Sequence, residues 1–341
     1  MKNPAFKPKQ TTKKLLAVLP ERAAHVLVGR FGLGNEPEKK TLESIGKKYG
    51  ITRERVRQIE NFALQTVKKS SAYAGEAVVF EDLKSHLASL GSVVTEEDLL
   101  GSISKDKSTQ NHVHFLLVLG DAFTRSKEDD VFRLHWSVSN ETKDKVRKAL
   151  ETLHQGLSPK DLIAESEMFD AFKKRLGSLA SEKDALSRWL RISKVVGRNH
   201  LGEWGLSSSP NIKIRGIRDY AYLVIRRHGS PLHFAEVAKL ITQVFGRPSH
   251  PATCHNELIK DKERFVLVGR GLYGLAEWGY TDGVVKDVII DILKKNGALS
   301  REALVQKVLK ERHVKENTVL VNLQNKKYFK RNENGTYALL A

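Results

Sequence analysis

Cysteine is almost absent from the sequence, and long apolar runs are missing. Cys254 is the single cysteine among 341 residues, so no intramolecular disulfide bond can form. The longest apolar runs, such as residues 115–119, fall far short of the about 20 residues that a membrane-spanning helix needs. The apolar step after the first lysines is also too short for the core of a signal peptide. We therefore expect a soluble cytoplasmic protein without membrane contact.

The sequence also lacks the residue groups that catalysis and metal binding require. His250, Cys254 and His255 lie close together, but a structural zinc site takes four ligands and no second cysteine exists. A capped helix start explains this group better. No G-x-x-x-x-G-K-[ST] phosphate loop occurs, and no nucleophile stands beside a base in a recognisable pattern. We expect no enzymatic activity, no metal and no cofactor.

Acidic residues are too few to balance the basic ones. The chain has 58 Lys and Arg against 40 Asp and Glu, which gives a net charge of +18 and a pI near 9.8. Residues 1–70 hold 16 basic and 6 acidic residues, residues 71–210 hold 19 and 21, and residues 284–341 hold 12 and 6. A basic amino-terminal part predicts a polyanionic partner such as nucleic acid, whereas the neutral middle favours protein contact.

Residues 41–60 predict two short helices joined by a tight turn. Gly50 stands at the corner between the two helical patterns, and Thr41 and Thr52 stand where helix N-caps belong. Helices that cross at such a turn need apolar side chains on the faces that meet. This segment supplies them at Ile45, Tyr49, Ile51, Val56 and Ile59.

The second of these helices has one apolar and one polar face. At about 100° per residue, the apolar face carries Val56, Ile59, Ala63 and Val67. The opposite face carries Glu54, Arg57, Gln58 and Asn61, with Arg53 at its edge. Arg and Gln present paired groups that fit base edges in the major groove, and Glu can accept a hydrogen bond from cytosine N4. The agreement of turn, caps and faces favours a DNA-reading helix over a merely solvated charged face.

Residues 19–69 resemble region 4 of the sigma-70 family of bacterial RNA polymerase sigma factors. The resemblance rests on PERAAHVLVGRFGL followed by TLESIGKKYGITRERVRQIENFAL. It implies that the second helix reads a promoter −35 element and that the domain docks on the flap of the polymerase β subunit. It also implies base contacts for Arg53, Glu54 and Gln58, with Arg55 and Arg57 near bases or phosphates.

The full set of candidate DNA-binding residues lies in and just before this helix. It comprises Lys47, Lys48, Thr52, Arg53, Glu54, Arg55, Arg57, Gln58 and Asn61. One departure follows the motif, since Asn61 and Phe62 stand where many sigma factors continue with Ala-Lys. The chain also has no aromatic-rich helix resembling sigma region 2, the part that opens promoter DNA. We expect double-stranded DNA binding without promoter melting.

The rest of the chain repeats a coarse pattern of helices followed by a short hairpin. The repeats cover residues 76–138, 141–209, 212–280 and 283–341, and a period of about 70 residues suits tandem small domains. Each resembles a winged helix. With a basic disordered tail at residues 1–14 and the helix-turn-helix domain at 15–70, we expect a mainly α protein of tandem helix-turn-helix and winged-helix domains with short β-hairpin wings.

Residues 212–280 resemble the HARE-HTH domain, a winged-helix module of the polymerase delta subunit, chromatin-associated proteins and some restriction enzymes. The resemblance rests on SPLHFAEVAKLI and RFVLVGRGLYGLAEWG, and it implies nucleic-acid or polymerase contact. Arg264, Arg270 and Tyr273 are candidate wing contacts, although Tyr273 and Trp278 fit the core better because a hairpin alternates its faces. The later run KKYFKR at residues 326–331 fits phosphate contact and a half-buried strand equally well.

The leading hypothesis is a DNA-binding transcription factor that couples sigma region 4-like promoter recognition to RNA polymerase contact. One alternative is a sigma mimic that binds RNA polymerase without reading DNA. Another is an accessory DNA-binding protein of a restriction or chromatin system, which only the HARE-HTH resemblance favours. The sequence leaves open the DNA target, the sign of regulation, the oligomeric state and the arrangement of the domains.

Overall fold

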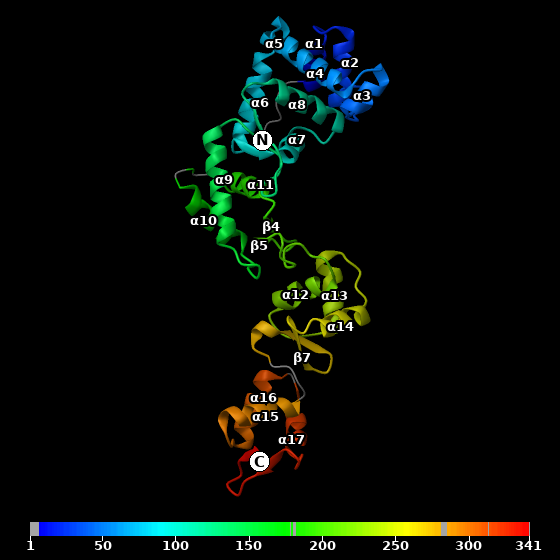
Figure 1. Cartoon of the computed structure of the whole chain (residues 1–341). Helices are drawn as coiled ribbons and strands as arrows, with labels where there is room; N and C mark the ends of the chain where they lie inside the picture. The colour runs from blue at the N-terminus through cyan, green and yellow to red at the C-terminus, as the bar shows by residue number, and fades with distance from the viewer. Residues whose placement is uncertain (1–6, 178, 180–181, 281–284, 313, 341) are drawn as a thin grey trace. The chain divides into compact units, whose positions relative to one another are not determined.

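A computed structural model describes residues 7–177, 179, 182–280, 285–312 and 314–340 (Figure 1). The chain is mainly α-helical with short antiparallel hairpins, which confirms the predicted fold class. It divides into two compact units, Met1–Ser208 and Ser209–Ala341. Among the described residues, no helix has the length and apolar character to cross a membrane.

The amino-terminal unit begins with a helical bundle. Its helices are α1 (Pro8–Leu16), α2 (Glu21–Phe31), α3 (Leu42–Tyr49), α4 (Arg53–Lys68) and the short α5 (Ser71–Gly75). A first module follows, with α6 (Ala77–Ser89), β1 (Val93–Thr95), α7 (Glu96–Ile103), α8 (Lys107–Leu119), β2 (Thr124–Ser126) and β3 (His135–Ser137). β3 lies between β1 and β2 in one antiparallel sheet.

Helix α1 overturns part of the predicted disordered tail. Pro8 occupies the start of the helix, where a missing N–H costs nothing. Thr12 and Leu15 are buried, and α1 packs on α8. The Lys14 ammonium also donates to the Glu76 carboxylate at 2.6 Å. The prediction of disorder is therefore wrong from Pro8 onward, and residues 1–6 lie outside the described residues.

A second module completes this unit with the same order of elements. It contains α9 (Asn140–Gln155), α10 (Glu165–Leu176), α11 (Lys183–Ile192), β4 (Val196–Arg198) and β5 (Trp204–Leu206). Ile163 forms an isolated antiparallel bridge with Trp204, in the place that β1 takes in the first module. Both modules therefore run helix, strand or bridge, helix, helix, strand, strand.

The carboxy-terminal unit holds two more modules of this order. The third has α12 (Ile217–His228), β6 (Leu232–His233), α13 (Phe234–Phe245), α14 (Pro251–Lys260), β7 (Phe265–Gly269) and β8 (Leu272–Leu275). The fourth has α15 (Val285–Asn296), α16 (Arg301–Glu311), α17 (Glu316–Leu323), β9 (Phe329–Arg331) and β10 (Tyr337–Leu339). A Leu299–Tyr337 bridge replaces the first strand of the fourth module. Residues 283–284, where the sequence predicts the start of that module, lie outside the described residues.

The hydrophobic cores of the amino-terminal unit cross the predicted domain boundaries. One core joins Leu27 and Val67 of the helical bundle to Leu83, Phe115 and Trp136 of the first module. A second core takes Val93 and Phe132 from the first module into the α9–α11 helices. The helical bundle and the two modules therefore share large parts of their apolar interiors.

The third helix of each module in this unit is covered by other elements. The α8 residues from Asn111 to Leu117 are all buried, and α1 and α2 pack against this helix. Helix α11 packs on β1, where the Trp189 indole donates to the Gly91 carbonyl at 3.0 Å. These two helices thus connect the parts of the unit.

Candidate nucleic-acid interface

The turn between α3 and α4 has the geometry that the sequence predicts. The Thr41 hydroxyl accepts from the Ser44 amide at 3.1 Å, and the Thr52 hydroxyl accepts from the Arg55 amide at 3.2 Å, so both threonines cap helices. Gly50 ends α3 with φ +64°, a left-handed conformation that glycine adopts without strain. These features confirm the predicted caps and corner.

Gly46 lets the chain after the turn approach α3 closely. A Cβ atom at this position would lie 2.6 Å from the Ile51 carbonyl oxygen, which is too close for any side chain. Ile45 and Val56 are buried beside Val26 of α2, and this small core fixes how α3 and α4 cross. The second half of α4 buries Ala63 and Val67 in the larger core, so the predicted apolar face is confirmed.

The polar face of α4 is left in solvent. All nine candidate DNA-binding residues are exposed, namely Lys47, Lys48, Thr52, Arg53, Glu54, Arg55, Arg57, Gln58 and Asn61. Anchoring on the opposite face holds this row of polar side chains on a fixed helix. That is the arrangement a major-groove reading helix requires.

Several of these side chains are paired along the helix. The Arg57 Nε and a terminal guanidinium nitrogen donate to the Glu54 carboxylate at 2.9 and 2.6 Å, and Arg55 donates to the Gln58 side-chain oxygen at 3.0 Å. The hydrogen bond from Arg57 lowers the pKa of Glu54, and the same bond raises the pKa of Arg57. Both groups therefore stay charged near neutral pH.

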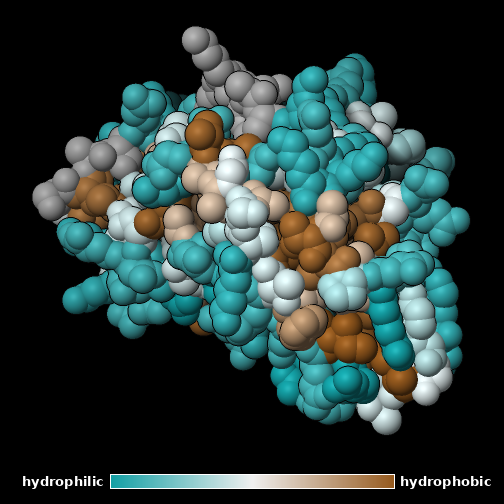
Figure 2. All heavy atoms as spheres, turned by 90° about the horizontal axis from the view of Figure 1, so that it is seen from above, coloured by the Kyte–Doolittle hydropathy of each residue, from teal (hydrophilic) through white to brown (hydrophobic). Residues whose placement is uncertain are grey.

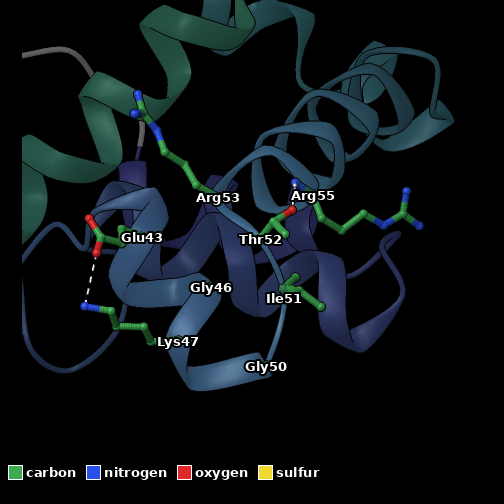
Figure 3. A pocket seen from close by; sticks show the side chains of 8 residues that line it. All are labelled: Glu43, Gly46, Lys47, Gly50, Ile51, Thr52, Arg53 and Arg55. Carbon is green, nitrogen blue, oxygen red and sulfur yellow. Dashed lines mark hydrogen bonds and ion pairs between the residues drawn. The ribbon is translucent and has the colours of Figure 1, made fainter.

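Arg53 differs from its neighbours. Among the described residues it forms no hydrogen bond or ion pair through its guanidinium group. Figure 3 shows the Arg53 and Arg55 side chains leaving the start of α4 in different directions, with Thr52 between them. Arg53 therefore offers a complete set of guanidinium donors, which can bind a guanine edge in bidentate fashion.

A depression of about 630 Å³ lies at the same turn (Figure 3). It is lined by Glu43, Gly46, Lys47, Gly50, Ile51, Thr52, Arg53 and Arg55. The Lys47 ammonium lies 3.1 Å from the Glu43 carboxylate, and both side chains are exposed. Because exposed pairs of this kind are weak, Lys47 can exchange its partner for a phosphate at little cost.

The predicted wing contacts of the third module have different surroundings. Arg264 forms ion pairs with Asp219 at 3.0 Å and Asp261 at 2.7 Å, and its side chain is only 22% exposed. The structure thus gives Arg264 a structural role within its module, unlike the wing contact that the sequence predicts. Arg270 is exposed at the turn between β7 and β8. Tyr273 is buried, which confirms its predicted place in the core.

The His and Cys group at the start of α14 behaves as a helix start. His250 is the N-cap, and its ring nitrogen accepts from the Ala252 amide at 3.3 Å, as the sequence predicts. Cys254 is buried, and burial raises the pKa of its thiol to about 12. In the part of the chain that the structure describes, no three His, Cys, Asp or Glu residues gather as a metal site would require.

An apolar depression beside α4 was not predicted. Figure 2 shows apolar side chains reaching the surface in patches among hydrophilic ones. Phe62 is 59% exposed and Val18 is 39% exposed, and they line a hollow of about 610 Å³ with polar residues of α4. The one sequence signal for this surface is the departure at Asn61 and Phe62.

The segment that contains α3 and α4 is similar to known proteins. Residues 15–69 match the family model described as Sigma-70, region 4. The RNA polymerase sigma factor RpoS of Coxiella burnetii (strain RSA 493 / Nine Mile phase I) is 54% identical over 56 residues, which are 16% of each chain. The RNA polymerase sigma factor SigA of Bacillus sp is 44% identical over 63 residues, 18% of this chain and 16% of SigA.

These matches cover a small part of each protein. The chain spans about a sixth of the length of the curated relatives it matches. They support the region 4-like helix-turn-helix that the sequence predicts at residues 19–69.

Proposed function

We propose that this chain is a DNA-binding transcription factor that recognises promoter-type duplex DNA through α4. The observation that carries the proposal is the exposed polar face of α4 on a helix anchored from behind, in a segment similar to sigma-70 region 4. Without a segment resembling the promoter-melting region, the protein binds duplex DNA without opening it.

Each polar side chain of α4 has a defined task in this proposal. The Arg53 guanidinium contacts a guanine edge, and Gln58 contacts an adenine edge or a neighbouring base. Glu54 accepts from cytosine N4, while Arg55 and Arg57 bind bases or phosphates. The bonds that hold Arg55 and Arg57 in the free protein lie within one exposed helix face, so exchanging them for DNA costs little.

The reading role is tested on a cognate site, which selection of bound sequences from a random duplex pool provides. Arg53→Ala and Gln58→Ala should each weaken binding by about 1–3 kcal/mol and relax specificity at one position. Gln65→Ala is the matched control, because Gln65 is an exposed glutamine of the same helix that lies seven residues beyond Gln58 and outside the set of candidate DNA-binding residues. If Arg53→Ala and Gln58→Ala both kept the original affinity and selectivity, α4 would not be the reading helix.

We also propose that the region 4-like segment contacts RNA polymerase, at the flap of its β subunit. Two relatives of this segment carry the name RNA polymerase sigma factor, and the hollow beside Phe62 and Val18 offers an apolar surface for a protein partner. Exposed large apolar side chains that lie together are typical of such surfaces.

Retention of core polymerase on the immobilised full-length protein tests this contact. Phe62→Ser should lower retention about tenfold, because removal of one apolar anchor costs about 1–2 kcal/mol. Val78→Ser, which changes a side chain that is 72% exposed and outside the hollow, should leave retention unchanged. Equal retention by both variants would contradict a contact at Phe62, and a sigma mimic would retain polymerase without sequence-selective DNA binding.

The remaining modules complete the proposal. Residues 212–280 are a HARE-HTH-type winged helix, which the order of its elements and the buried Tyr273 support. The modules at residues 76–138, 141–209 and 283–341 have the same order of elements, and we assign them to the winged-helix type as well. The whole chain acts as a regulatory protein without catalytic activity, in which α4 supplies sequence selectivity.

A further inference from the structure

The third helices of the two carboxy-terminal modules lie on the surface. Helix α14 exposes Pro251, Thr253, Asn256, Ile259 and Lys260. Helix α17 exposes polar residues at its start and Val321 near its end. Unlike α8, which is buried along most of its length, these helices leave a face available to a partner.

The cations around α14 are largely compensated by carboxylates of the same module. Arg218 and Lys260 both pair with Glu257, at 3.2 and 3.0 Å. Arg264 pairs with Asp219 and Asp261, as described above. These paired cations therefore contribute little positive charge for binding a polyanion.

The cations that follow α17 have a different environment. Lys326 and Lys327 lie in the turn after the helix, and Lys330 and Arg331 lie in β9. All four are exposed, and none forms an ion pair with another described residue. Phe329 between them is buried and fixes the strand. Four uncompensated positive charges thus stand within six residues on an anchored hairpin.

Nearby groups add to this surface. The Lys286 ammonium of α15 lies 4.5 Å from the centre of the Tyr328 ring, and it forms an ion pair with the Asp287 carboxylate at 3.5 Å, so this cation beside the turn is already partly compensated. Gln324 and Asn325 precede the lysines and are exposed, so their amides can donate hydrogen bonds to an anion. The nearest acidic residue in sequence is Glu333, which follows the run in the turn between β9 and β10.

We propose that Lys326, Lys327, Lys330 and Arg331 form a second DNA-binding surface that holds the phosphate backbone of duplex DNA without reading its sequence. Duplex DNA carries one negative charge per about 1.7 Å of its axis, so closely spaced cations can each reach a phosphate. Phosphate oxygens of DNA commonly accept hydrogen bonds from Asn and Gln side chains as well as from Lys and Arg. The surface goes beyond the proposed reading role of α4, because it adds affinity that is independent of sequence.

The expected signature is a change in salt dependence. Each phosphate contact contributes about 0.9 to the slope of log K against log salt concentration. Replacing all four residues in the full-length protein by Ala should therefore lower the slope by about 3–4 on a labelled duplex of unrelated sequence. The selectivity of the variant, measured by selection from a random pool, should stay that of the original protein.

The matched control removes the same charge from the same module. Lys294, Lys295, Lys307 and Lys310 are exposed residues of α15 and α16, and replacing them by Ala should change the slope by less than about 1. A variant with Lys326→Arg, Lys327→Arg and Lys330→Arg keeps the charges and should keep the original slope. It also shows whether a loss in the Ala variant comes from lost charge or from a damaged hairpin.

Three outcomes would overturn the proposal. The first is an unchanged slope in the Ala variant, and the second is an equal loss in the control. The third is binding of a polyglutamate peptide or of phosphatidylserine vesicles that is as tight as duplex binding and equally sensitive to the four substitutions. A failure of α4 to select any sequence would leave this test intact, because the duplex used here is unrelated to a cognate site.

Discussion

The first two modules and the last two have the same order of elements but use their third helix differently. Helices α8 and α11 pack against elements outside their own modules, whereas the main contacts of α14 and α17 are with helices of their own modules. The fold alone therefore does not determine which module is free to bind. Apolar character alone does not make this difference, since α8 is buried along most of its length but α11 is amphipathic and leaves Asp184 and Arg191 exposed.

The distribution of charge follows the same division. Residues 71–210, which hold the covered helices, carry 19 basic and 21 acidic residues, and residues 284–341 carry 12 and 6. A net charge near zero favours packing between parts of one chain, because the parts do not repel each other. We infer that the first two modules serve as scaffold for the region 4-like segment.

The largest expected effect on stability comes from truncating a buried side chain of a covered third helix. Phe115 of α8 is fully buried, with its ring 5.1 Å from the ring of Phe31. Phe115→Ala should lower the free energy of unfolding of the amino-terminal unit by about 3–5 kcal/mol, because it removes buried surface and leaves a cavity. Denaturant unfolding followed by tryptophan fluorescence measures this, since Trp136, Trp189 and Trp204 are buried in that unit.

The corresponding change in an exposed third helix is the control. Val321 of α17 is 57% exposed, so Val321→Ala should change stability by no more than about 0.5 kcal/mol. A similar loss of stability in both variants would remove the distinction between covered and exposed third helices.

A smaller loss of stability is expected when the pH is lowered. Burial lowers the pKa of His114 in α8 to about 4, outweighing the nearby Glu96 carboxylate, and the Lys39, Lys107 and Arg125 cations lower it further. In the unfolded chain His114 regains its ordinary pKa near 6.5 and binds a proton first. Stability of the amino-terminal unit should therefore fall as the pH drops from about 6.5 to 4, by on the order of 1–3 kcal/mol.

Unfolding curves at several pH values test this prediction against two variants. His114→Gln removes the titrating group and should flatten the dependence between pH 7 and pH 5. The same substitution at the exposed His228 of the other unit should leave the profile unchanged. A profile that His114→Gln does not alter would assign the acid sensitivity to other groups, such as the buried His86, His112 and His135, whose pKa values are also lowered by burial.

Local signals made the helix-turn-helix predictable from sequence. Thr41, Thr52 and Gly50 act through hydrogen bonds and backbone angles that involve only a few neighbouring residues. The spacing of Val56, Ala63 and Val67 likewise places the apolar face of α4 without reference to the rest of the chain. Caps, turns and helix periodicity are therefore reliable guides, as they were for the His250 cap.

Contacts between distant segments were not predictable in the same way. Helix α1 packs against α8, which lies about 100 residues later in the chain. No pattern within residues 1–14 predicts this contact. Arg264 looked like a wing contact, but Asp219 lies 45 residues earlier and engages its guanidinium group. Composition near a residue says little about the charge that the fold places beside it.

The core shared by the helical bundle and the first module also governs the order of events during synthesis. The region 4-like segment is complete on the ribosome by residue 69, yet Phe115 and Trp136 of its core are still to be made. At about 5–20 residues per second, the remaining 67 residues take roughly 3–13 seconds. During that interval the nascent segment keeps apolar surface exposed. The region 4-like segment is therefore translated before the residues that complete its hydrophobic core.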